Sequence, residues 1–217
     1  MMTPLSRQDE TSSARGILFI LSGPSGVGKD TVLRHAFPRS NQQIRTSISV
    51  TTRPPRPDEQ DGVDYFFVTP EAFQRLLAED GLLEHAEVHG HCYGTPRAWV
   101  EEQLRAGMDV VLEIDVQGAW QVKKLFPQAV LIFLAPPSWQ ELARRLRARQ
   151  TDDEASIRRR LRNAQDELAR AQQYDYLIVN DRMTEAVDQF AAIVTAERLR
   201  PRRYDLSHLL AEGASNV

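Results

Sequence analysis

The sequence predicts an α/β fold in which a parallel sheet forms the core and helices cover both of its faces. Four short apolar runs, at 17–21, 110–114, 129–134 and 176–179, alternate along the chain with segments of helical periodicity. Continuous apolar runs are typical of strands buried on both faces, and intervening helices are the usual crossovers between parallel strands. Ligands of such folds bind at the carboxyl ends of the strands. The residues that follow each run are therefore the first candidates for a functional site.

The first run leads into the most specific pattern of the chain. Gly-Pro-Ser-Gly-Val-Gly-Lys at 23–29 has the spacing of a phosphate-binding P-loop, and the residues after it can form a helix. Glycines let successive N–H groups converge on phosphate oxygens, and the helix adds its positive end. Lys29 is then expected to reach the β- and γ-phosphates of a nucleotide. The next position departs from the motif, because it holds Asp30 and not Ser or Thr, with Thr31 following. A glycine-rich turn that binds nothing is the alternative.

The segment 48–98 breaks the alternation of apolar strands and helices. Its proline-rich loop excludes a helix, and Thr69 followed by Pro70 is typical of a helix start. Short strands and turns of this kind predict a mixed α+β insertion at the carboxyl edge of the main sheet. The expected elements are an alternating β-branched run at 44–52, a proline-rich loop at 53–59, a strand at 64–68, a helix from 70 to about 81 and a strand at 82–88.

Beyond the insertion the α/β alternation resumes. In the strand at 109–115, Glu113 and Asp115 lie two apart, so both side chains point to one face. Asp115 follows the apolar run as a Walker-B carboxylate does, and it could hold Mg²⁺ directly or through water. Two acids at a strand end that bind nothing are the alternative. The expected helices are at 96–106, 138–149, 153–171 and 184–199.

These elements predict a P-loop core with two inserted units. The core comprises residues 16–47, 99–137 and 172–200, and the units are the α+β segment at 48–98 and a helical segment at 138–171. Residues 1–15 are polar and are expected to be a disordered extension, and 201–217 a loose tail.

Composition excludes several classes of protein. The net charge of −3 and the pI near 6.0 give no general attraction to nucleic acid or anionic membranes. No apolar run approaches the roughly 18 residues of a membrane span, and the N-terminus lacks the apolar core of a signal peptide. The single cysteine, Cys92, cannot form an internal disulfide, which fits a reducing compartment. We therefore expect a soluble cytoplasmic protein with neither nucleic acid nor membrane as a partner.

Arginines are concentrated in two places. Arg53 and Arg56 share the proline-stiffened loop, and a guanidinium fork suits bidentate capture of phosphate. Two loop arginines are nevertheless more often simply solvated. The second group, on the helices of the 138–171 unit, consists of Arg144, Arg145, Arg147, Arg149, Arg158, Arg159, Arg160 and Arg162.

Several blocks, in their order along the chain, resemble the guanylate kinase family over about residues 17–200. They are the loop 23–29, SVTTRPPRPDE at 49–59, GVDYFFV at 62–68, LLEHAEVHGHCYGTP at 82–96, VLEIDVQGA at 111–119 and YDYLIVND at 174–181. The resemblance implies ATP-dependent phosphorylation of GMP, and of dGMP, to GDP in purine nucleotide metabolism and GMP recycling. Transfer is expected to be direct and in line, with Mg²⁺ as cofactor and without a covalent intermediate. Monomer and homo-oligomer are both left open.

The resemblance also implies a role for each site residue. Ser49, Glu84, Thr95 and Glu113 match positions that hold guanine. Arg53, Arg56, Tyr65 and Tyr93 match positions that hold the GMP phosphate, with Glu59 supporting the arginines. Gly23, Pro24, Ser25, Gly26, Val27, Gly28, Lys29, Asp30 and Thr31 match the ATP phosphate site, and Asn180 a contact with adenine. Arg145, Arg149 and Arg160 match lid arginines that, with Lys29, act on the transferred phosphoryl group.

The chemistry of guanine agrees with the position of Glu84. Guanine offers N1–H and its N2 amine side by side, which one carboxylate can accept as a pair, whereas adenine presents a bare acceptor at N1. A site built on such hydrogen bonds can reject the wrong base by roughly 10⁴-fold.

Three positions depart from the usual family pattern. Asp30 replaces the usual Ser or Gly, Gln150 stands where glycine is frequent in a lid turn, and Glu113 stands where some members have Asp. A ribose-bisphosphate-type small-molecule kinase is the nearest alternative function. A non-catalytic guanylate-kinase-like interaction module is the alternative from another class.

Overall fold

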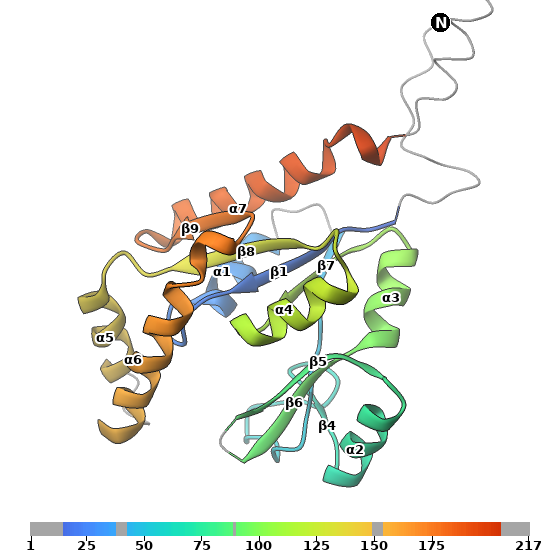
Figure 1. Ribbon diagram of the computed structural model, residues 1–217, viewed down its shortest axis with the longest axis horizontal. Coiled ribbons are helices and arrows are strands. Elements are labelled where there is room, and N and C mark those ends of the chain that lie inside the picture. Colours follow the sequence, from blue (N-terminus) through green and yellow to red (C-terminus); the bar gives the residue numbers. More distant parts are fainter. Residues whose placement is uncertain (1–14, 38–42, 89, 149–153, 205–217) are drawn as a thin grey trace, which may run out of the picture.

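A five-stranded parallel sheet forms the core of the computed structural model, which describes residues 15–37, 43–88, 90–148 and 154–204. The strand order is β2-β7-β1-β8-β9, and every pairing within it is parallel (Figure 1). The predicted fold class is confirmed. The strands are β1 (Leu18–Ser22), β2 (Ile44–Thr46), β7 (Asp109–Glu113), β8 (Val130–Ala135) and β9 (Tyr176–Val179).

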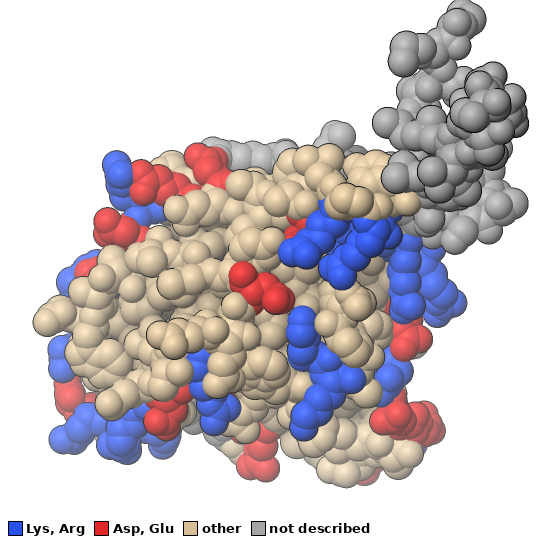
Figure 2. Space-filling model, turned by 45° about the horizontal axis from the view of Figure 1, so that its top comes forward, with Lys and Arg blue, Asp and Glu red and all other residues tan. Residues whose placement is uncertain are grey.

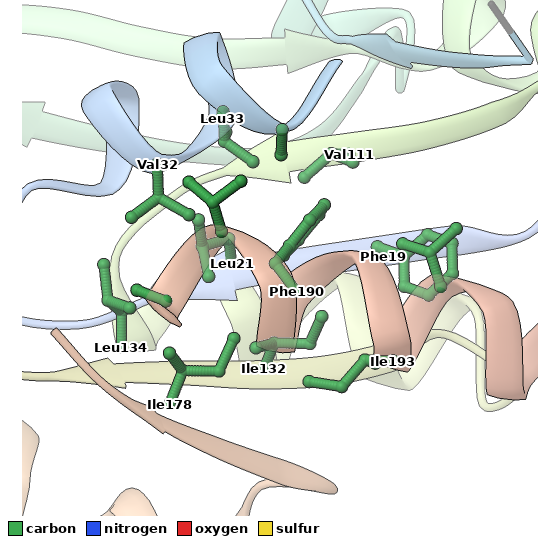
Figure 3. Close-up of a cluster of buried hydrophobic side chains, with 14 of the residues drawn as sticks. Phe19, Leu21, Val32, Leu33, Val111, Ile132, Leu134, Ile178, Phe190 and Ile193 are labelled. Atoms are coloured by element: carbon green, nitrogen blue, oxygen red, sulfur yellow. The ribbon is translucent and has the colours of Figure 1, made fainter. Parts of the chain in front are cut away.

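Helices cover both faces of this sheet, and the alternation of β1 shows why. Phe19 and Leu21 point to the face covered by α1 (Lys29–Ala36) and α7 (Met183–Arg198), where the cluster in Figure 3 includes Phe190 of α7. Leu18 and Ile20 point to the opposite face, covered by α3 (Arg97–Arg105) and α4 (Val116–Leu125). Because successive strand residues face opposite ways, one uninterrupted apolar run serves both cores.

A second, four-stranded sheet lies beside the core in the order β4-β3-β6-β5 (Figure 1). The helix α2 (Pro70–Ala78) packs on it through Phe73 and begins as predicted, with the Thr69 hydroxyl accepting from the Ala72 N–H at 3.2 Å. The strands are β3 (Val50–Thr51), β4 (Phe66–Phe67), β5 (Leu82–Val88) and β6 (His91–Pro96).

Three features of the fold differ from the expectation. The run at 44–52 is two strands, because β2 joins the main sheet and β3 the second one. The stretch 91–96, for which no element is predicted, is the strand β6, paired with both β3 and β5. The helix α4 is also absent from the prediction, although the Asp115 carboxylate caps it by accepting from the Gly118 N–H at 2.8 Å.

The remaining helices pair at one end of the core. α5 (Trp139–Ala148) and α6 (Glu154–Leu168) share a small apolar cluster that includes Leu142 and Ile157. The chain then passes through the 3-10 helix η2 (Ala171–Gln173) into β9. After α7, the first residues of the segment expected to be loose form the 3-10 helix η3 (Pro201–Arg203), where the Arg203 Nε donates to the Glu197 carbonyl at 2.7 Å.

A buried ion pair holds the amino edge of the sheet, opposite the P-loop. Asp109 accepts from the Ile17 N–H at 2.7 Å and from the Arg198 Nε at 2.6 Å, and it is 4% exposed. We expect Asp109→Ala to lower the free energy of unfolding in urea by about 3–5 kcal/mol, because it leaves the buried Ile17 N–H and the largely buried Arg198 guanidinium without their acceptor. Glu185→Ala, which breaks an exposed pair with Arg182, is the control and should cost less than about 1 kcal/mol. Equal losses in the two variants would contradict the assignment.

Candidate functional site

The predicted site residues gather at the carboxyl edge of the main sheet. The P-loop follows β1 in the centre, Glu113 ends the neighbouring β7 with Asp115 just after it at the N-cap of α4, and Asn180 follows β9. The second sheet and the α5–α6 pair extend from the core on this side (Figure 1). The arrangement is that expected of a ligand site in an open parallel sheet.

The P-loop is braced from behind by side chains of other elements. Gly28 has φ +97°, and a Cβ there would lie 2.9 Å from the Asn180 Nδ2. That buried amide donates to the Val27 carbonyl at 2.8 Å, and Arg145 donates to the Asn180 carbonyl at 3.1 Å. Asn180 and Arg145 thus contact the loop itself. The family resemblance assigns Asn180 to adenine and Arg145 to the phosphoryl group.

The first two side chains of α1 have separate partners. Lys29 donates from Nζ to the Gly23 carbonyl at 2.7 Å, so its ammonium lies over the loop. The Asp30 carboxylate accepts from the Arg34 Nε at 2.8 Å, one turn further along the helix. The negative charge of Asp30, which the motif does not have, is therefore balanced by Arg34.

Two large cavities open in front of the loop and share Asp30 and Glu113 in their linings. One, of about 700 Å³, contains Lys29. The other, of about 950 Å³, lies against the second sheet. The adjacent cavities can hold two ligands end to end, with Lys29 beside their junction. Further lining residues of the first are Gly23, Ser25, Gly26, Gly28, Thr31, Asp115, Arg159, Arg160 and Glu167, and of the second Ser49, Arg56, Glu59 and Tyr65.

Contacts within the protein hold in place the arginines beside the second cavity. Arg53 donates from Nη2 to Glu59 at 2.8 Å, and the other Glu59 oxygen accepts from the Arg56 N–H at 2.8 Å. This N–H, and then the Arg53 guanidinium, lower the pKa of Glu59. Arg53 also lies 5.6 Å from the ring centre of Tyr65, whose ring meets that of Tyr93 at 6.0 Å. The structure therefore brings together all five residues predicted for a phosphate.

A buried carboxylate lies on β5, the edge strand of the second sheet that packs against α4. Glu84 is 7% exposed, and its Oε1 accepts from the Thr95 hydroxyl at 2.6 Å. Burial raises its pKa to about 7, against the opposing effect of the Thr95 hydrogen bond, and Asp115 adds to the rise. A carboxylate held at this cost is typical of a binding site. Glu113 is similar, because burial raises its pKa while Lys29 opposes the rise.

Three residues of α6, Arg159, Asn163 and Glu167, line the P-loop cavity without having been assigned there from the sequence. Arg159 belongs to the unassigned group of arginines, and Glu167 lies one turn beyond Asn163, near the end of the helix. The Glu167 Oε2 is buried and has no hydrogen-bond partner among the described residues. No sequence signal distinguishes Glu167 from the other charged residues of α6. Arg160 also lines the cavity, whereas Arg149 and Gln150 lie outside the described residues.

The donor set of the P-loop cavity suits Mg²⁺. Asp115 and Glu167 both line it, and carboxylate oxygens are the ligands this ion prefers. Within the described ranges, no group of three His, Cys, Asp or Glu side chains could hold a metal. A magnesium ion here would therefore take most of its ligands from phosphates and water, as is usual for nucleotide sites.

None of the helices in the described part of the chain has the length and apolar character needed to cross a membrane.

Comparisons with known proteins identify relatives over almost the whole chain. A family model described as guanylate kinase matches residues 15–197. A guanylate kinase of Thermus thermophilus is 55% identical over 87% of this chain and 85% of its own, and one of Latilactobacillus sakei 48% identical over 89% and 96%. The crystal structure of guanylate kinase from Anaplasma phagocytophilum superposes with a TM-score of 0.75 at 34% identity, covering 94% of this chain and 97% of that one. The family predicted from the motif blocks is confirmed.

The raised pKa of Glu84 predicts a specific dependence of stability on pH. The folded protein holds a proton on Glu84 up to about pH 7, whereas the unfolded chain holds it only up to about pH 4.5. Protonation of Glu84 therefore stabilises the folded state at low pH, and this stabilisation is lost as the pH rises through 7. Glu84→Gln cannot titrate. Urea titrations give the free energy of unfolding of this variant and of the wild type at each pH. We expect the difference, variant minus wild type, to rise by about 2–3 kcal/mol between pH 5 and pH 8. Glu87→Gln on the same strand is the control, and a flat difference for both variants would refute the assignment.

Proposed function

The chain belongs to the guanylate kinase family, and from this premise we propose that it transfers the γ-phosphoryl group of ATP to GMP, and to dGMP. The observation that carries the proposal is the pair of cavities that meet at Asp30 and Glu113. One is built around a P-loop, and the other is lined by Arg56 and Tyr65, with Arg53 and Tyr93 against the Tyr65 ring. This pair suits a nucleoside triphosphate on one side and a nucleoside monophosphate on the other.

Guanine is read by carboxylates in this proposal. The N1–H and N2 amine donate to Glu84, whose burial makes an unpaired charge costly and a paired one selective. Thr95 already holds one Glu84 oxygen at 2.6 Å and thereby fixes the direction of the group. Ser49 and Glu113 complete the guanine contacts.

Different residues bind the phosphate of GMP and the phosphates of ATP. Arg53, Arg56, Tyr65 and Tyr93 bind the phosphate of GMP, and Glu59 keeps the two arginines oriented. The backbone of the 23–29 loop and Lys29 bind the β- and γ-phosphates of ATP, with Asn180 near adenine and Thr31 at the helix start. Asp115, with water and with Glu167 beside it, holds Mg²⁺, which supplies neutralisation of phosphate charge when it is bound.

Catalysis in this proposal is positioning and charge neutralisation. The GMP phosphate attacks in line, while Lys29 donates to the phosphoryl oxygens where negative charge develops. The arginine-rich α5–α6 unit (residues 138–171) closes over the reacting groups with Arg145, Arg149 and Arg160 and excludes water that would hydrolyse ATP. Figure 2 shows basic side chains gathered at the end of the molecule where α5 and α6 lie.

A coupled assay of ADP release tests the function. With ATP and Mg²⁺, we expect rapid turnover of GMP and dGMP and little with AMP, UMP or ribose bisphosphate. Preference for the bisphosphate would favour the ribose-bisphosphate-type kinase. Absence of ADP release with every acceptor would favour the non-catalytic module.

The two-cavity arrangement predicts that the effects of substitution separate by substrate. Arg53→Ala removes a charge-assisted contact with the GMP phosphate, so we expect KM for GMP to rise roughly ten- to hundredfold. KM for ATP should stay within about twofold, because Arg53 lies in the other unit. Arg75→Ala, an exposed arginine of α2, is the matched control. A similar rise of both KM values for Arg53→Ala would contradict the assignment.

A further inference from the structure

The strand that carries Glu84 is irregular at that residue. In its ladder with β6, Leu82 pairs with Pro96 and His85 with Gly94, so Leu83 and Glu84 together face Thr95 alone. Such a bulge bends the strand and re-aims its side chains. Leu82 and Leu83 pack into different apolar clusters on the two sides of the strand, and Glu84 is also buried. The bulge therefore lets an acid stay buried directly beside two leucines.

A glycine of α4 leaves the space that the Glu84 carboxylate occupies. A Cβ built on Gly118 would lie 2.8 Å from the Glu84 Oε2 and 3.3 Å from its Cδ, which is closer than real Cβ contacts. Alanine is the better helix former at such a position, by about 1 kcal/mol. The glycine is therefore explained by the neighbouring carboxylate and not by the helix.

The same face of α4 fixes the backbone of the bulged strand. Gln121, one turn after Gly118, accepts from the His85 N–H at 3.2 Å and donates to the His85 carbonyl at 3.3 Å. Positions three apart lie on one helix face. Gly118 thus leaves room for the Glu84 side chain while Gln121 holds the next residue of the strand.

We propose that Gly118 is a specificity-determining position, which with Gln121 holds the Glu84 carboxylate in the orientation that accepts both donors of guanine. The inference rests on the proposed function and adds two positioning residues to it. The Gly118 N–H also donates to Asp115 at 2.8 Å. One turn of α4 therefore positions the carboxylate of the guanine side and that of the phosphate side.

Gly118→Ala tests the proposal through base selectivity. The new methyl group displaces the end of a side chain and no backbone atom, so the carboxylate should move while the fold is kept. We expect KM for GMP to rise roughly ten- to hundredfold with kcat and KM for ATP within about twofold, since the lost contacts serve binding. IMP keeps N1–H but lacks the N2 amine, so its KM should rise less and the preference for GMP over IMP should shrink.

A double-mutant cycle separates positioning from a general disturbance. In a Glu84→Gln background the guanine contact is already weakened, so adding Gly118→Ala should change KM for GMP by less than about twofold. Lys124→Ala, an exposed residue of the same helix, is the control and should keep the wild-type selectivity. Additive effects, or equal rises of KM for GMP and IMP, would overturn the proposal.

Two further outcomes are distinguishable. If Gly118→Ala does not fold, as judged by circular dichroism, Gln121→Ala replaces it: a reduced preference for GMP over IMP supports the proposal, and an unchanged preference overturns it. If the wild type does not phosphorylate GMP, both proposals fall. If it does, and Gly118→Ala keeps the full preference, only the present inference falls.

Discussion

The turn from β1 into α1 packs closely against β8, α5 and Asn180 while its open side lines the P-loop cavity, and the arrangement of the site depends on this constraint. A Cβ on Gly23 would lie 2.1 Å from the Leu134 carbonyl oxygen of β8, and one on Gly26 would lie 2.8 Å from Leu146 of α5. The loop therefore touches the next strand and the α5–α6 unit at once. Asn180 and Arg145 complete the enclosure through the Val27 and Asn180 carbonyls. Backbone N–H groups held this rigidly can bind phosphate without paying an ordering cost at each binding event.

Buried acids are the second constraint, and they oppose stability. Burial raises the pKa of Glu84, Glu113 and Glu167, so each weakens the folded state at neutral pH. No global need of the fold explains them, since the apolar clusters on both faces of the sheet are complete without them. All three lie around the two cavities or on the strand beside them. Such groups are retained where a ligand offers the partner that the protein lacks.

Much of this architecture could be predicted from the sequence because its signals are local. The apolar runs, the glycine spacing and the Thr69-Pro70 helix start each depend on neighbouring residues only. The strand β6 could not be predicted, because Gly94 and Pro96 disfavour a strand and its stability comes from pairing on both edges with β3 and β5. The helix α4 does carry a signal, an Asp N-cap followed by apolar residues three apart, but Gly118 weakens it.

The site shows the same division between local and long-range information. Motif spacing located the P-loop, and the family resemblance pointed to the arginines and to Glu84. The structure brings together the five residues expected around the GMP phosphate. The bracing roles of Asn180 and Arg145 could not be predicted, because both donate to the Val27 carbonyl of a loop more than a hundred residues away. The place of Gly118 against Glu84 has the same origin, since only the packing of α4 on β5 joins them.

Ion pairs within the protein organise the charges of the site. Glu59 holds Arg53, and Glu141 holds Arg145 at 2.7 Å, with Arg144 and then Arg145 lowering the pKa of Glu141 to about 2. A guanidinium has five donors in a fixed plane, so a carboxylate on one edge orients the fork and leaves other donors for a phosphate. Internal acids thus limit repulsion among the clustered cations and keep their geometry. This explains how a chain with a net charge of −3 can present a cationic site to two phosphorylated ligands.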